Sequence, residues 1–185
     1  MLEEKLLKKK LLYLFYFGLI LGIFRIIPHP PNFTPILASA IVAPILLKSR
    51  IFGILIPILA MFISDIIIGF HSYQFVIYLT LLSIGLVSPL MKNYKFVALM
   101  SLLSSLWFFI VTNFAVWLMW EYYPKNIEGL IACYTLALPF FKNTIISTFI
   151  FAFLILFLSK YLIKVNEKAN SYIYNFIYKF RNISR

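Results

Sequence analysis

Apolar stretches about as long as a membrane-crossing helix make up most of this chain. A helix needs roughly 20 apolar residues to cross about 30 Å of hydrocarbon, so 185 residues leave room for about six crossings. Hydrophobic residues form 63% of the sequence and charged residues 12%, which excludes an ordinary soluble domain. The sequence therefore predicts an all-α integral membrane protein. The expected spans are about 11–27, 35–47, 51–70, 74–91, 96–120 and 142–161.

Three segments have their own expected roles. Residues 130–141 are apolar but too few to cross a bilayer, so we expect a separate, partly re-entrant or surface-lying helix before Pro139. The span 74–91 carries no charged side chain, which predicts a scaffold wall. Residues 166–185 alternate apolar and basic positions at helical spacing, which predicts an amphipathic helix on anionic lipid. We therefore divide the chain into a membrane domain, 1–165, and a cytoplasmic tail, 166–185.

The distribution of Lys and Arg over the loops supports this span count, because basic residues gather on the cytoplasmic side of membrane proteins. One side receives Lys5, Lys8, Lys9, Lys10, Lys48, Arg50, Lys92, Lys95, Lys160, Lys164, Lys168, Lys179, Arg181 and Arg185. The other side receives only Arg25, Lys125 and Lys142. The pattern predicts a multi-pass protein of the inner (plasma) membrane with both termini in the cytoplasm.

The stretch from Arg25 to Pro35 places polar side chains and four prolines between two apolar segments. Proline fixes φ and removes an amide donor, so this stretch cannot continue a helix. Irregular backbone at membrane depth survives only where protein or water satisfies its polar groups. We therefore expect a stiff loop at the rim of a polar pocket, with His29 and Asn32 in it.

Polar residues of separate spans are expected to meet at the level of this loop. Arg25 and Asp65 each lie about 14 residues, or about 21 Å, from the inner ends of their spans at 1.5 Å per residue. An isolated charge at that depth costs at least about 2.5 kcal/mol, so either an ion pair or a direct ligand role is expected. The candidate substrate-binding residues are Arg25, His29, Asn32, Asp65, His71, Asn113, Lys142 and Asn143.

Other chemistry has little support in the sequence. His29 and His71 have no metal-ligand spacing and no definite third ligand, and Cys133 is the only cysteine, so we expect no metal site. The chain lacks the motifs of hydrolases, metalloproteases and phosphate-binding loops, so we expect no catalytic residues and no cofactor. The net charge of +11 is interpreted as a topology signal and not as a nucleic-acid surface.

Several motifs occur together in one order along the chain. They are Arg25-x-x-Pro28-His29-Pro30-Pro31-Asn32-Phe33-Thr34-Pro35, Ser64-Asp65 with Gly69-x-His71-Ser72, Val111-Thr112-Asn113-Phe114-x-x-Trp117, Tyr123-Pro124, and Ala137-Leu138-Pro139-Phe140-Phe141-Lys142-Asn143-Thr144. Over about residues 18–160, the chain resembles an uncharacterised family of short membrane proteins that are described as transport proteins. That family is similar in size and span number to the substrate-binding S components of energy-coupling-factor transporters.

The resemblance implies a subunit that captures a small nutrient or vitamin-like molecule from the outer face. A transmembrane coupling subunit and ATP-binding subunits would be its partners, docked through small residues such as Gly18 and Gly22 or Ser39 and Ala43. The alternative is a non-transport scaffold of a cell-envelope or cell-shape assembly. In a scaffold, the basic tail and the small-residue faces would carry the function.

Overall fold

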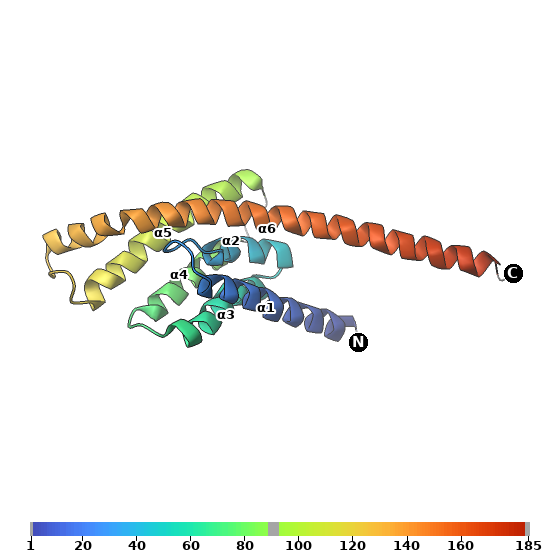
Figure 1. The fold of residues 1–185 in the computed structure, drawn as a ribbon, viewed down its shortest axis with the longest axis horizontal. Coiled ribbons are helices and arrows are strands. Elements are labelled where there is room, and N and C mark those ends of the chain that lie inside the picture. Colours follow the sequence, from blue (N-terminus) through green and yellow to red (C-terminus); the bar gives the residue numbers. More distant parts are fainter. Residues whose placement is uncertain (1, 89–92, 184–185) are drawn as a thin grey trace. The chain divides into compact units, whose positions relative to one another are not determined.

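In the computed structural model, all described secondary structure is helical. The backbone is described for residues 2–88 and 93–183, and side chains for residues 11, 12, 14–88 and 93–161. The helices are α1 (Leu2–Ile26), α2 (Ile36–Leu47), α3 (Arg50–Ile68), α4 (Gln74–Val87), α5 (Tyr94–Met119) and α6 (Ile127–Ile183) (Figure 1). The chain forms two compact units, Met1–Ala152 and Phe153–Arg185. The expected domain boundary after residue 165 stays a prediction.

Three of the helices are long and apolar enough to cross a bilayer within the described part of the chain. They are Arg50–Ile68, Tyr94–Met119 and Ile127–Tyr161. Shorter apolar helices are Leu14–Ile26, Ile36–Leu47 and Gln74–Val87. Large apolar side chains stay exposed on these helices, for example Ile67 at 65% and Leu79 at 57%. Such surfaces suit contact with lipid better than contact with water.

The core of the first unit is α2. Residues Ile36 to Pro44 are all buried, and a helix that is apolar on every side is stable only when other elements surround it. Helices α3, α4 and α5 contact it. At Gly53 of α3 the two backbones approach so closely that an added Cβ would lie 2.3 Å from Cα of Pro44.

Helix α1 packs against α3 through its glycines. A Cβ at Gly22 would lie 3.1 Å from the carbonyl oxygen of Ala60, and one at Gly18 would lie 3.1 Å from Leu59. Ser39 and Ala43 are buried inside α2. The expectation that these small residues dock a coupling subunit is therefore wrong, because the chain's own helices cover them.

The expected helix break at Pro139 is also wrong. Helix α6 is continuous from Ile127 and contains Pro139, so residues 130–141 form no separate helix. A proline removes a single backbone hydrogen bond, and helices in a membrane tolerate that loss. The backbone of residues 166–183 is helical, but the side chains that would make the predicted amphipathic face lie outside the described residues.

Candidate functional site

The proline loop, residues 27–35, lies between α1 and α2 and forms one edge of a cavity. Asn32 adopts the left-handed conformation with φ of 61°, and the amide of Phe33 donates to the carbonyl oxygen of Pro30 at 2.9 Å. Helix α6 fixes the loop, since Asn143 Nδ2 donates to the Pro31 carbonyl at 3.0 Å and Ser147 Oγ to that of Asn32 at 3.3 Å. The loop is therefore held by its own turn and by two hydrogen bonds from α6.

Arg25 and Asp65 form an ion pair that joins α1 to α3. Asp65 is fully buried, whereas the Arg25 side chain is 18% exposed. Arg25 Nη1 also donates to Ser64 Oγ at 2.7 Å, and Tyr78 of α4 donates to Asp65 Oδ2 at 2.7 Å. Arg25 lines the cavity and Asp65 does not, so the carboxylate stands behind the guanidinium and orients it.

Helix α4 is more than the scaffold wall that the sequence predicts. Besides Tyr78, it supplies Gln74, whose Nε2 donates to the Tyr78 hydroxyl at 3.2 Å. The Gln74 side-chain oxygen accepts from the His71 amide at 3.4 Å. The ion pair is thereby connected to the loop between α3 and α4. A tyrosine four residues after a glutamine gives no charge signal in the sequence, so only the fold identifies these two residues.

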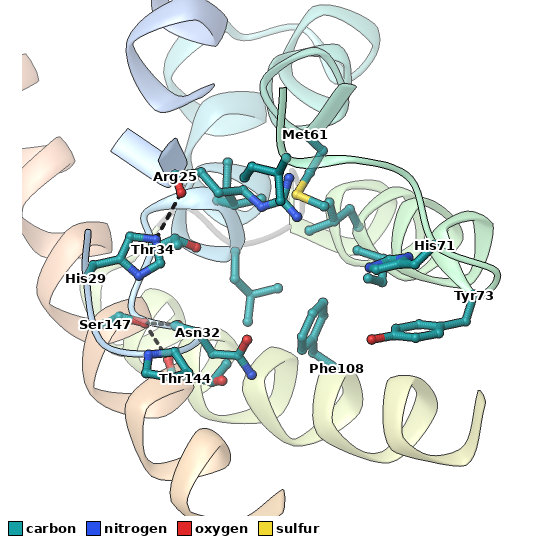
Figure 2. A pocket seen from close by; sticks show the side chains of 16 residues that line it. Arg25, His29, Asn32, Thr34, Met61, His71, Tyr73, Phe108, Thr144 and Ser147 are labelled. Carbon is teal, nitrogen blue, oxygen red and sulfur yellow. Dashed lines mark hydrogen bonds between the residues drawn. The ribbon is translucent and has the colours of Figure 1, made fainter. Parts of the chain in front are cut away.

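The first cavity, which we call the polar chamber, has a volume of about 340 Å³, within the range of roughly 300–1,000 Å³ that is typical of ligand pockets. Figure 2 shows Arg25, Asn32 and His71 bordering the same space. Its polar lining consists of Arg25, His29, Asn32, Thr34, His71, Tyr73, Thr144 and Ser147.

The two histidines of the polar chamber are held differently. His29 faces two carbonyl oxygens, with Nδ1 2.8 Å from that of Pro30 and Nε2 3.2 Å from that of Arg25. The His71 ring stacks on Tyr73 with centroids 4.2 Å apart, and its buried Nδ1 has no partner. Burial raises the pKa of the Tyr73 hydroxyl, which stays protonated at neutral pH.

A second cavity of about 540 Å³ adjoins the first, and we call it the aromatic chamber. The two cavities share the lining residues Pro31, Asn32, Tyr73, Ile77, Phe108 and Thr144. Its aromatic lining consists of Tyr73, Phe108, Phe109, Trp120, Tyr122, Tyr123, Phe140 and Phe141. Asn113 also lines this chamber and donates from Nδ2 to the Phe109 carbonyl at 2.7 Å.

Two loops contribute lining residues to the aromatic chamber. Trp120 Nε1 donates to Ser72 Oγ at 3.0 Å and so ties the end of α5 to the loop before α4. Lys125 donates to the Trp117 and Trp120 carbonyl oxygens, which the end of α5 leaves without helical partners. Local sequence patterns do not reveal this tie, because it depends on the tertiary arrangement of the two loops.

The structure brings most of the predicted site residues together. Arg25, His29, Asn32 and His71 line the polar chamber, and Asn113 lines the aromatic chamber. The remaining three, Asp65, Asn143 and Lys142, line neither chamber: the first lies behind Arg25, the second behind the proline loop, and the third is exposed. Within the described residues, no group of three or more His, Cys, Asp or Glu side chains could hold a metal ion.

Fold and site together define an all-helical protein with apolar, membrane-type helices and a two-chambered cavity. The chain belongs to a family of unknown function (DUF6580), whose sequence profile matches residues 5–171. Neither a curated protein nor a solved structure matches the chain. No comparison links it to the S components of energy-coupling-factor transporters.

Proposed function

We propose that this chain is a multi-pass membrane protein that captures a small solute in the two chambers. The main support for this proposal is that four separate elements line the same space. The proline loop, α4, α5 and α6 all contribute side chains to both chambers. Helices that only packed together would fill this space with apolar side chains. The cavity instead keeps a guanidinium, two imidazoles and two amides at its walls.

The uneven distribution of basic residues supports an orientation in which the proline loop faces outward. In that orientation the protein takes its solute from the outer side, as a transport subunit would. A coupling subunit would have to dock away from Gly18, Gly22, Ser39 and Ala43, since these are buried. ATP-driven coupling stays a prediction of the sequence resemblance alone.

Mass spectrometry of the molecules that co-purify with the protein tests the proposal directly. We expect one small molecule in near-stoichiometric amount, displaced on denaturation. The scaffold alternative predicts a purified protein without such a molecule.

A matched pair of variants places the site. Thr144 lines both chambers, whereas the exposed Thr135 lines neither, and each hydroxyl donates to the carbonyl four residues before it on α6. We expect Thr144→Val to weaken binding of the co-purified molecule about two- to tenfold, because one hydrogen bond contributes about 0.5–1.5 kcal/mol. Thr135→Val should leave the affinity unchanged. Equal affinities in equilibrium dialysis of both variants would place the site elsewhere.

A further inference from the structure

The two chambers differ in chemistry, and their shared wall lets one molecule reach both. Charged and imidazole side chains line the polar chamber, and aromatic rings line most of the other. A solute that fits the proposed function therefore has two unlike ends. The residues at each end define which groups it carries.

The polar chamber selects for a hydrogen-bond acceptor. Both bonds that Arg25 makes to Ser64 and Asp65 leave from Nη1, so the hydrogens on Nε and Nη2 remain as donors. His71 and Tyr73 also line this chamber, and an imidazole N–H and a phenol hydroxyl can each donate a hydrogen bond. A carboxylate accepts from several such donors at once.

The same chamber discriminates against cations. None of the residues that line either chamber is Asp or Glu, and the Asp65 carboxylate stands behind Arg25. An ammonium group in this space would lie beside Arg25 without a carboxylate to compensate it. Burying an unpaired charge in that way is strongly unfavourable.

The aromatic chamber selects for a flat ring. Phe109 stacks on Phe141 with centroids 4.5 Å apart, and Trp120 meets Tyr73 edge to face at 5.1 Å. A ligand ring that packs against these two pairs of side chains gains both buried apolar area and aromatic contacts. Asn113 turns an amide hydrogen to its own helix, which leaves Oδ1 to accept from a ring N–H or O–H.

We propose that the site takes a planar aromatic acid, with the ring in the aromatic chamber and the carboxylate toward Arg25 and His71. This inference rests on the proposed function and narrows it to one substrate class.

Equilibrium dialysis of labelled indole-3-acetate against the purified full chain tests the class, with unlabelled competitors. Tryptamine exchanges the acid for an ammonium group, and cyclohexylacetate exchanges the aromatic ring for a saturated one. We expect each to compete at least about tenfold more weakly than unlabelled indole-3-acetate. Competition by tryptamine or cyclohexylacetate that equals indole-3-acetate would overturn the assignment.

Two variants separate the chambers. The double variant Arg25→Gln, Asp65→Asn replaces the ion pair with a neutral hydrogen-bonded pair. It should abolish the preference for indole-3-acetate over tryptamine and keep the preference for indole-3-acetate over cyclohexylacetate. Phe109→Leu should keep the preference over tryptamine and abolish the preference over cyclohexylacetate. The inference is wrong if both variants lose both preferences equally or neither loses any.

Failure of the substrate class can be distinguished from failure of the proposed function. A cationic or aliphatic molecule found with the purified protein would overturn the substrate class and leave solute capture standing. Absence of any co-purified molecule, together with no binding of any probe, would overturn both.

Discussion

Asp65 is fully buried, and its two carboxylate oxygens are held by two different helices. Arg25 of α1 bonds Oδ1, and Tyr78 of α4 donates to Oδ2 at 2.7 Å. A buried carboxylate is tolerated only when it is paired and hydrogen-bonded, and the two partners meet that requirement. The result is a guanidinium fixed at the wall of the polar chamber.

The hydroxyl of Tyr78 should contribute more to stability than a tyrosine hydroxyl that bonds a neutral acceptor. We expect Tyr78→Phe to lower the free energy of unfolding by about 2 kcal/mol, because its acceptor is charged. Tyr134→Phe is the matched control, since its hydroxyl donates to the neutral Ile110 carbonyl at 2.6 Å, and it should cost about 1 kcal/mol. Reversible unfolding in mixed detergent micelles measures both. Equal losses would show that the charge of Asp65 adds nothing to the Tyr78 hydrogen bond.

At the scale of helices, the short central helix α2 sets how closely its neighbours approach. Its small residues Ala38, Ala40 and Ala43 are buried almost completely, so α3 can pack close to the α2 backbone. Prolines inside α2, α3 and α6 do not end these helices. The cluster of prolines and polar residues between α1 and α2, by contrast, forms the irregular proline loop.

Substitution of Gly53 tests the close approach of α3 to α2. A Cβ there would meet backbone atoms of Pro44 at 2.3 and 2.4 Å, whereas a Cβ at Gly85 would meet the side chain of Ile54 at 2.6 Å. We expect Gly53→Ala to destabilise the fold by about 1–3 kcal/mol, the usual cost of overpacking. Gly85→Ala should cost less, because the Ile54 side chain can rotate away. Thermal unfolding in detergent compares the two variants, and the reverse order would contradict the packing.

At the scale of the molecule, the unit Met1–Ala152 contains all residues that line the two chambers. The exposed surfaces of its helices are apolar, and the loops 27–35, 69–73 and 120–126 gather around the chambers. Basic residues concentrate in the other loops and at the ends of the chain. These basic loops alternate along the chain with the loops around the chambers, so we predict that the proposed solute site lies on the side opposite the cytoplasm.

Cysteine labelling in intact cells tests that orientation. Cys133 is buried, and Cys133→Ser gives a background without cysteine. With a membrane-impermeant maleimide, we expect Tyr122→Cys in the loop before α6 to react in intact cells. Ser49→Cys, between α2 and α3, should react only after permeabilisation. Labelling with the opposite pattern would invert the topology and place the chambers on the cytoplasmic side.

The sequence by itself determined where most helices and loops lie, because apolar run length and clustered prolines act locally along the chain. It also predicted that Arg25 and Asp65 pair or line a pocket, since charges at that depth need partners. Only the tertiary structure decided that Asp65 stands behind Arg25, that Tyr78 completes the pair, and that Lys142 lies outside the chambers. Helix rotation and the approach of distant segments decide these features, and local sequence patterns contain neither.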